Sequence, residues 1–406
     1  MEKIVLFINA LTTVGGGERL MFEEEKYFRS KGNRTYILTY DFNKRALFDG
    51  AYNRRRVKIM NEEKKSNNVL ITTIFRILLL RSKIREIKPD IIIAQSAWEC
   101  IYLYFATLFT PYFYVVHIHG TIFWFDNNLL KYAFIHRGVF NEIRNSLVGH
   151  REFIPIKPPK FNLAKKIASE LIAVAMYLGV RKAKQIFVLS NHMRWEVGRL
   201  YGKDAIVLQG AFPRRIFSYK PRKNIKQKLG LTNKKIILTI NRLDPRKRVD
   251  LLIKAFRQMD KKEKNAVLVI GGKGPDERRL KRMVKNLNIG DKVKFLGHVK
   301  EHELWDYYSC CDIFAHLNWA DFAIAPFEAL ALGKKVVWTS EMNVEKSLIQ
   351  NKRIFVTDPE VKKAAQALGK ALNARIAKGS KSNNLYKYTW DQYFHEIDKL
   401  CFYPKT

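Results

Sequence analysis

The chain has 406 residues, of which 74 are Lys or Arg and 38 are Asp or Glu, so its formal charge is +36. Hydrophobic residues make up 47% of the sequence and aromatic residues 13%, which excludes a disordered polycation and suffices for large buried cores. At about 100–200 residues per domain, the length indicates two or three domains. The four cysteines include no CxxC pair, which excludes a disulfide scaffold and argues against a zinc site.

Short apolar strands alternate with helical patterns over the first half of the chain, and this alternation predicts a parallel sheet. The predicted strands are residues 4–8, 35–38, 91–94, 114–117, 186–189 and 205–208. The run at 4–8 is too short for a signal-peptide core, and Pro111 divides the longest apolar stretch into a helix and a strand. We therefore expect a cytoplasmic protein without a transmembrane helix.

The helix predicted at residues 69–87 interleaves apolar and basic side chains. This pattern is typical either of a domain helix with a solvated basic face or of an amphipathic helix at a membrane surface. Residues 123–167 are less regular and rich in aromatic and basic side chains. The large positive charge indicates a polyanionic partner, which can be nucleic acid, an anionic lipid surface or a phosphorylated substrate, or it reflects a Lys-rich host proteome.

A linker rich in Gly, Pro and basic residues at 210–233 precedes a second alternating pattern. Its predicted strands are residues 236–240, 267–270, 293–295, 313–316 and 336–338, and its predicted helices are residues 249–259, 277–287, 303–309 and 327–332. The fold class is therefore α/β, with two Rossmann-like halves. We place the first domain at residues 1–212, the second at 213–385 and a C-terminal helix at 386–406.

Glycines and cations follow several predicted strands, where open α/β sheets bind ligands. Gly16 and Gly17 open a helix after the first strand, so backbone N–H groups there can approach an anion, although the GxGxxG fingerprint is absent. Arg242 and Lys247 follow the first strand of the second half and suit a diphosphate, with a solvated basic loop as the alternative. Gly272 forms a further glycine turn with its neighbours.

The loop at residues 321–333 becomes a helix, and its free N–H groups can face a phosphate. We place Glu328 in the first turn, where a carboxylate also simply stabilises the helix dipole. His117 is the last residue of the strand predicted at 114–117, and His119 follows it closely. If the strand continues, its period of two places both side chains on the same side. No HxxxH or DxD pattern accompanies them, so we predict no metal site.

Taken together, these ordered motifs resemble the retaining GT-B glycosyltransferases of the family-4 type, the glycosyl transferases group 1. The resemblance covers nearly the whole chain and is strongest over residues 240–333. The matching motifs are residues 15–19 (GGGER, the GG-x-E-R opening), 241–247 (NRLDPRK, G-R-L-x-x-x-K), 272–275 (GKGP, G-x-G-P), 293–297 (VKFLG, V-x-F-L-G) and 388–391 (YTWD, the closing Y-S-W element).

The resemblance implies two Rossmann-like domains facing across a cleft, with the C-terminal helix returning to the first. It implies a nucleotide diphosphate sugar as donor, held without cofactor or metal. Arg242 and Lys247 would neutralise the diphosphate and stabilise the leaving group. His119 would contact the transferred sugar, and Glu328 would bind the nucleotide ribose. The further donor-binding positions would be Gly16, Gly17, Gly272, Gly274, Ile324 and Ala325.

The chain departs from the family pattern at one position. Eight residues before Glu328, where the family has the first glutamate of its E-x7-E element, this chain has Ala320. Either Asp321, the next residue, takes over the contact with the donor sugar as a catalytic residue, or that contact is altered. Retention without an obvious carboxylate nucleophile implies a front-face mechanism, in which the leaving phosphate assists the acceptor hydroxyl.

The leading hypothesis is thus a retaining glycosyltransferase that moves a sugar to an acceptor hydroxyl. The basic and aromatic density of residues 123–166, together with the helix at 69–87, favours a lipid-linked or other anionic glycan acceptor and peripheral contact with an anionic membrane. The alternatives are a GT-B relative such as a nucleotide-sugar epimerase, and a non-catalytic protein that binds nucleic acid or another polyanion. No RRM, KH, helix-turn-helix or zinc motif supports a specific nucleic-acid partner.

Overall fold

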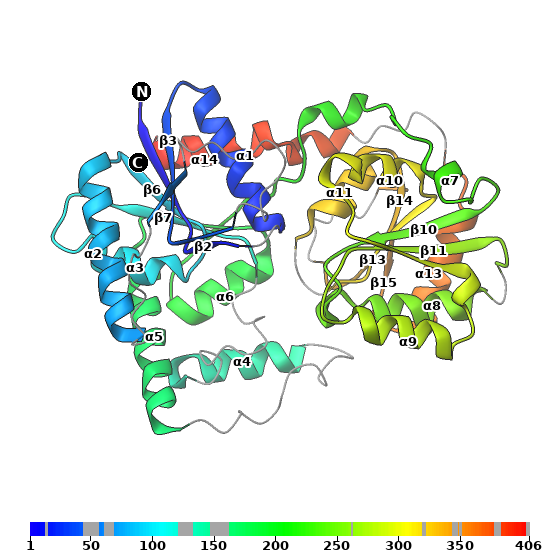
Figure 1. The fold of residues 1–406 in the computed structure, drawn as a ribbon, viewed down its shortest axis with the longest axis horizontal. Helices are drawn as coiled ribbons and strands as arrows, with labels where there is room; N and C mark the ends of the chain where they lie inside the picture. Colours follow the sequence, from blue (N-terminus) through cyan, green and yellow to red (C-terminus); the bar gives the residue numbers. More distant parts are fainter. Residues whose placement is uncertain are drawn as a thin grey trace. The chain divides into compact units, whose positions relative to one another are not determined.

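The chain forms two compact units in the computed structural model (Figure 1). Unit 1 consists of Met1–Gln209 and Tyr393–Thr406, and unit 2 of Gly210–Gln392. The predicted domain limits at residues 212 and 386 lie near these divisions. The described residues are 1–12, 15–43, 57–60, 69–120, 133–146, 162–260, 263–318, 322–342, 348, 351–376 and 383–402.

Unit 1 is built on a seven-stranded parallel sheet in the order β5-β3-β1-β6-β7-β8-β9. Its strands are β1 (Lys3–Phe7), β3 (Arg34–Thr39), β5 (Val57–Ile59), β6 (Ile91–Ala94), β7 (Tyr114–Ile118), β8 (Ile186–Val188) and β9 (Ile206–Val207). The central strands are buried runs of Ile, Val and Leu, as expected for a parallel sheet covered on both faces. All six predicted strands are confirmed. Strand β5 and the small parallel pair β2 (Ala10–Leu11) and β4 (Asp41–Phe42) were not predicted.

Helices α1 to α6 belong to unit 1, as does the C-terminal helix α14 from Tyr393 onward. They are α1 (Gly16–Ser30), α2 (Val69–Ile87), α3 (Glu99–Ala106), α4 (Phe134–Ser146), α5 (Leu163–Lys182), α6 (Asn191–Tyr201) and α14 (Trp390–Phe402). Helix α14 lies beside α1 (Figure 1), where Phe394 packs on Tyr27 and Phe402 packs on Phe28. The predicted return of the C-terminal helix to the first domain is therefore confirmed.

Unit 2 contains a six-stranded parallel sheet in the order β12-β11-β10-β13-β14-β15. The strands are β10 (Lys235–Ile240), β11 (Ala266–Gly271), β12 (Val293–Gly297), β13 (Ile313–His316), β14 (Lys335–Thr339) and β15 (Ile354–Thr357). The helices are α7 (Ile225–Lys228), α8 (Val249–Asp260), α9 (Glu277–Asn286), α10 (Leu304–Cys310), α11 (Ile324–Ala331) and α13 (Val361–Asn373), with 3-10 turns at Arg214–Ser218, Pro245–Lys247, Gly290–Lys292, Glu301–Glu303 and Asn383–Tyr388. Numbered along the chain, the strands follow the order 3-2-1-4-5-6 of a Rossmann fold. Strand β15 and the helices α7 and α13 were not predicted from the sequence.

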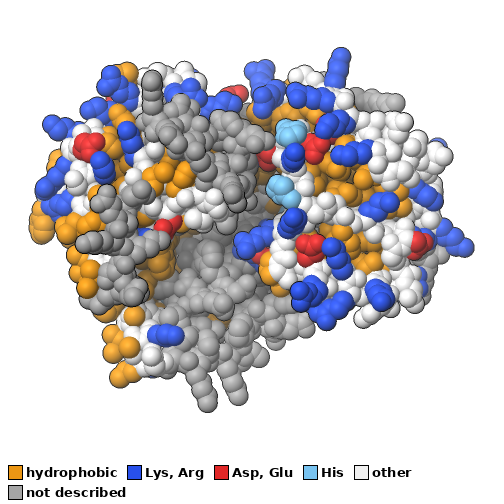
Figure 2. Space-filling view, viewed as in Figure 1, with side chains coloured by type: hydrophobic (Ala, Val, Ile, Leu, Met, Phe, Trp, Pro, Cys, Tyr) orange, Lys and Arg blue, Asp and Glu red, His pale blue; other side chains and the backbone are white. Residues whose placement is uncertain are grey.

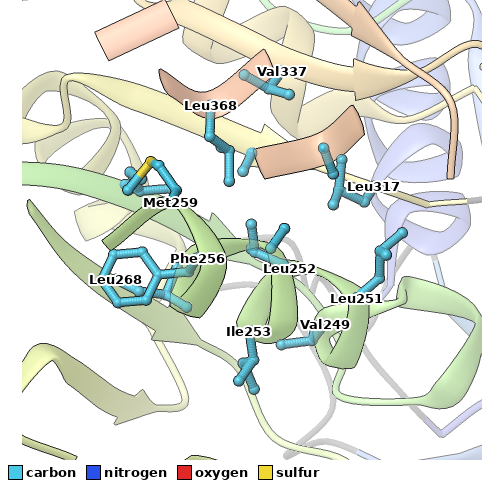
Figure 3. Packing of buried hydrophobic residues seen from close by; sticks show 14 of the residues in the cluster. Val249, Leu251, Leu252, Ile253, Phe256, Met259, Leu268, Leu317, Val337 and Leu368 are labelled. Atoms are coloured by element: carbon cyan, nitrogen blue, oxygen red, sulfur yellow. The ribbon is translucent and has the colours of Figure 1, made fainter. Parts of the chain in front are cut away.

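The core of unit 2 forms where α8 and α13 cover the sheet (Figure 3). Leu252, Phe256 and Met259 of α8 are buried together with Leu268 of β11 and Leu368 of α13. Their spacing at positions i, i+4 and i+7 places the three α8 side chains on one helix face. This packing fixes the start of α8, and with it the loop that connects β10 to α8.

Candidate active site

The loop after β10 carries the predicted diphosphate-binding residues of unit 2. Strand β10 lies between β11 and β13, so this loop leaves the sheet at its topological switch point, where open α/β sheets bind ligands. Arg242 is exposed, and Lys247 ends a 3-10 turn in which the Asp244 side chain accepts a hydrogen bond from the Arg246 N–H at 3.1 Å. The structure thus places Arg242 and Lys247 on one loop at the predicted edge of the sheet.

The arginines of this loop differ in their partners. Arg246 pairs with the Asp244 carboxylate at 3.0 Å, and the buried Arg248 pairs with Glu341. Within the described part of the chain, Arg242 has no carboxylate partner, so its guanidinium is available to an anionic ligand. Arg248 also adopts a left-handed backbone (φ +48°) at the end of the turn, a conformation that is uncommon for residues other than glycine.

Gly272 and Gly274 hold the loop after β11 directly against the loop that carries Arg242. A Cβ atom at Gly272, where φ is +118°, would lie 1.7 Å from the carbonyl oxygen of Asn241, and one at Gly274 would lie 2.1 Å from that of Leu243. The Leu243 N–H also donates to the Lys273 carbonyl at 3.0 Å. The two glycines of the predicted G-x-G-P turn are therefore needed for the close packing of the two loops. Their contact with the donor remains a prediction.

His316 and Asn318, at the end of β13, are two site residues that sequence analysis missed. Both are buried, and neither His316 ring nitrogen nor the Asn318 amide nitrogen has a hydrogen-bond partner among the described residues. Burial, and to a smaller extent the nearby Lys247 ammonium, lower the pKa of His316 to about 3. A neutral imidazole therefore lies near Lys247, and its position at the end of a predicted strand was the signal available in the sequence.

Glu328 is buried in α11, and its carboxylate accepts a hydrogen bond from the Trp305 indole N–H at 2.9 Å. The prediction that Glu328 lies in the first turn is wrong, because α11 begins at Ile324 and Glu328 is its fifth residue. Pro326 is tolerated within the first turn, so the helix starts before it. Ile324 and Ala325 form the helix start, whose N-cap Ala323 has no side-chain cap. Asp321 and Ala320 lie outside the described residues.

In unit 1, the predicted residues meet where β7 and α1 approach each other. A Cβ atom at Gly17 would lie 3.3 Å from the His119 Cβ, so α1 starts directly against this histidine. Gly16 is the first residue of α1. The rings of His117 and His119 lie 4.2 Å apart, which confirms their predicted placement on the same side. Burial first, and then His117, lower the pKa of His119 well below the usual histidine value.

Two further polar residues in unit 1 were not predicted from the sequence. The His119 Nε2 atom lies 2.8 Å from the Gln95 Oε1 atom, and the Gln95 amide donates to Glu24 at 3.0 Å. In the described ranges, no three His, Cys, Asp or Glu side chains gather in a way that would hold a metal ion. Each unit thus brings polar side chains to the carboxyl ends of its central strands.

Two parallel sheets of Rossmann-like strand order in one chain are the arrangement of the GT-B class of glycosyltransferase folds. The family Glycosyl transferases group 1 matches residues 221–390, and Glycosyltransferase Family 4 matches residues 14–208. The chain therefore belongs to the group 1, family-4 glycosyltransferases of the GT-B type, as the sequence motifs predicted.

Curated relatives share part of the chain. Mannosylfructose-phosphate synthase of Agrobacterium fabrum is 31% identical over 147 residues, which cover 34% of this chain and 32% of that protein. The GDP-mannose-dependent alpha-(1-6)-phosphatidylinositol monomannoside mannosyltransferase of Mycolicibacterium smegmatis is 27% identical over 145 residues, covering 34% of this chain and 38% of that protein. Alpha-monoglucosyldiacylglycerol synthase of Streptococcus pneumoniae is 31% identical over 117 residues, covering 28% and 26%. The matches thus span about a third of these relatives.

Solved structures match the whole fold. A glycosyltransferase from Rickettsia africae superposes with a TM-score of 0.71 at 18% identity, covering 100% of this chain and 99% of that chain. HepE of Anabaena, solved in complex with UDP and glucose, superposes with a TM-score of 0.66 at 17% identity, covering 99% and 96%. At these identities the likeness shows the GT-B fold.

Proposed function

We propose that this protein is a retaining glycosyltransferase that moves a sugar from a nucleotide diphosphate sugar to an acceptor hydroxyl. The observation that carries the proposal is the set of polar residues at the switch point of unit 2. Arg242 has no carboxylate partner in the described chain, Lys247 lies near neutral His316, and the buried Glu328 carboxylate is oriented by Trp305. Two cations suit a diphosphate, and a fixed carboxylate suits the hydroxyls of a ribose.

The comparisons support this choice of substrate. The Anabaena structure contains UDP and glucose, and the Mycolicibacterium relative is a GDP-mannose-dependent enzyme. In the proposed reaction, Arg242 and Lys247 neutralise the charge that develops on the leaving diphosphate, so the step uses no metal and no cofactor. His119 is assigned to the transferred sugar and Glu328 to the nucleotide ribose, whereas the contact of Asp321 with the sugar stays a prediction because this residue lies outside the described ranges.

A panel of UDP-, GDP- and ADP-sugars tests the proposal by thermal shift and by product analysis. One donor should raise the melting temperature, because a ligand that binds only the folded state stabilises it. With a labelled form of that donor, the sugar should appear on an acceptor with its original anomeric configuration by NMR. Isomerised free sugar would instead favour the epimerase alternative. Salt-sensitive DNA binding without any response to the panel would favour the polyanion-binding alternative.

The acceptor of the proposed reaction is lipid-linked, and one face of unit 1 contacts the anionic membrane that carries it. Helix α3 packs against both α2 and α5, and these outer helices expose apolar side chains. The apolar side chains on one face of α5 are Leu163, Ile167, Leu171, Val174 and Leu178, and those of α2 are Ile71, Ile74, Phe75 and Leu78. Phe109, which is 97% exposed, follows α3. Figure 2 shows hydrophobic side chains with Lys and Arg among them at the edge where α2 lies.

Basic residues accompany this apolar surface. The exposed cations on and after α5 are Lys165, Lys166, Arg181, Lys182 and Lys184, and those near the end of α2 are Arg85 and Lys88. Apolar ridges beside cations fit the acyl boundary and the phosphates of an anionic bilayer. The relatives include enzymes named for phosphatidylinositol and diacylglycerol products, which supports a lipid acceptor. No helix in the described part of the chain is both long and apolar enough to cross a membrane.

Replacing Ile167 and Leu171 with Asp should weaken co-sedimentation with anionic liposomes about tenfold or more, because two exposed apolar side chains no longer enter the interface. Co-sedimentation at moderate salt measures the effect. The matched control is Val356→Asp, which alters an exposed apolar residue of β15 in unit 2 and should bind liposomes as the native protein does. Equal binding by the α5 variant and the native protein would contradict the proposed membrane face.

A further inference from the structure

A buried chain of polar side chains connects α1 to His119. Glu24 of α1 is fully buried, and its Oε2 atom accepts a hydrogen bond from the Gln95 amide nitrogen at 3.0 Å. Gln95, which follows β6 and is also buried, lies with its Oε1 atom 2.8 Å from the His119 Nε2 atom. Three elements far apart in the sequence thus converge on one imidazole, and the donor and acceptor at each step can be worked out.

The chemistry of the chain fixes the position of the His119 proton. An ionised carboxylate only accepts hydrogen bonds, so Gln95 must turn its amide NH₂ toward Glu24 and its carbonyl oxygen toward His119. A carbonyl oxygen also only accepts, so His119 must carry its proton on Nε2. Because burial keeps His119 neutral, the Nδ1 atom is then unprotonated. This Nδ1 atom is buried and has no hydrogen-bond partner within the described ranges.

We propose that Glu24, acting through Gln95, holds His119 in the neutral Nε2–H tautomer and thereby presents Nδ1 as a hydrogen-bond acceptor for a hydroxyl of the transferred sugar. Glu24 and Gln95 are positioning residues, since both act through His119. The tautomer follows from the hydrogen-bond chain, whereas the sugar hydroxyl as the donor to Nδ1 rests on the proposed function. Gly17 lies beside this histidine, since a Cβ atom there would approach the His119 Cβ atom to 3.3 Å.

The groups that face Glu24 from other elements set its charge. His119 and His117 come from the end of β7, with the His117 Nδ1 atom 3.6 Å from the Glu24 Oε1 atom. From α14, Tyr393 bonds His117 through its hydroxyl, and Cys401 lies near the Glu24 carboxylate. Burial raises the pKa of Glu24 to about 7, although the hydrogen bond from Gln95 and the nearby His119 both act to lower it.

The hydrogen-bond chain from Glu24 to His119 therefore depends on pH, and the ionisation of the Glu24 carboxylate sets the direction of the change. Above a pH of about 7, Glu24 is ionised and requires the NH₂ side of Gln95, which enforces the Nε2–H tautomer. Below that pH a protonated Glu24 can donate to the Gln95 carbonyl. The amide is then free to reverse, and the requirement on His119 is removed. Activity that depends on the Nδ1 acceptor should decline on the acid side with this ionisation.

Long-range ¹H–¹⁵N NMR of protein labelled at its nine histidines reads the tautomer without any substrate. The His119 signals are assigned with a His119→Asn variant. We expect the Nε2–H pattern in the native protein at pH 8, and a mixed or Nδ1–H pattern in both Glu24→Gln and Gln95→Met. Glu25→Gln is the matched control, since Glu25 is the adjacent buried carboxylate of α1 and bonds Thr35 instead. An Nδ1–H pattern in the native protein, or an unchanged pattern in both variants, overturns the proposal.

Kinetics with the identified donor form the second measurement. Glu24→Gln should lower kcat/KM about tenfold at pH 8 and lose the acid limb of the native pH profile, while Glu25→Gln keeps both. A purely structural function of Glu24 would lower the melting temperature and leave the tautomer and the profile unchanged. The NMR measurement needs no substrate, so it tests the effect of Glu24 and Gln95 on the His119 tautomer even if the proposed function fails. The kinetic measurement, by contrast, depends on the proposed function.

Discussion

Replacing Lys247 with alanine is expected to lower kcat/KM for the nucleotide-sugar donor by about 10²–10³-fold, the usual loss when one electrostatic contact to a developing charge is removed. Lys247 ends the turn after β10 and lies near the neutral imidazole of His316, which adds no competing positive charge. Arg242→Ala should produce a loss of similar size. Steady-state kinetics with the donor identified by thermal shift measure both effects, which should persist with EDTA in the assay.

The control for this experiment is Lys254→Ala, because Lys254 is an exposed lysine of α8 in the same unit. Its removal should leave kcat/KM within about twofold of the native value, since exposed charges away from a site contribute little. The melting temperatures of all three variants should stay close to that of the native protein. Native turnover in both Lys247→Ala and Arg242→Ala would show that the diphosphate is bound elsewhere.

Gly274→Ala should destabilise unit 2 by about 3 kcal/mol or more, among the larger effects expected of a single substitution. The added methyl group would lie 2.1 Å from the carbonyl oxygen of Leu243, which is backbone and cannot rotate away. The Leu243 carbonyl is also tied to the Asp276 N–H at 3.0 Å, so relief of the clash breaks a hydrogen bond. Denaturant unfolding measures the loss of stability.

Gly290→Ala is the matched control, since a Cβ atom at Gly290 meets no atom within 4 Å and its φ is not in the left-handed region. It should change the free energy of unfolding by less than about 0.5 kcal/mol. Gly274→Ala should also weaken donor binding, because the loop that shifts carries Arg242. Native stability in Gly274→Ala would mean that the two loops do not pack as described.

The parts of the site that were predictable are those encoded by neighbouring residues. The loop with Arg242 and Lys247 combines a strand end, a turn and two cations within a few positions, so its place and its chemistry could both be predicted. Family membership followed from several such motifs in order. The packing reason for Gly272 and Gly274 was not visible, because it depends on a second loop from another strand.

Other features of the site could be recognised only from the tertiary structure. Glu24 and Gln95 are 71 residues apart, and a glutamate within an amphipathic helix normally indicates a solvated position. His316 ends a predicted strand, but only the packing around it shows that its ring is buried and neutral. The predicted start of α11 at residue 327 is three residues late, because the helix includes Pro326 in its first turn, a place where proline is accepted.

The division between the two units falls inside α14, after Gln392, so unit 1 is assembled from two stretches of chain with all of unit 2 inserted between them. A ribosome therefore completes the β-strands of unit 1 long before it delivers Tyr393, Phe394 and the rest of α14. Until then, the surface of α1 around Tyr27 and Phe28 lacks its aromatic cover, and His117 lacks its hydroxyl partner. The first half of the molecule to be synthesised is thus the last to be finished, and the inserted unit, being continuous in sequence, can mature ahead of it.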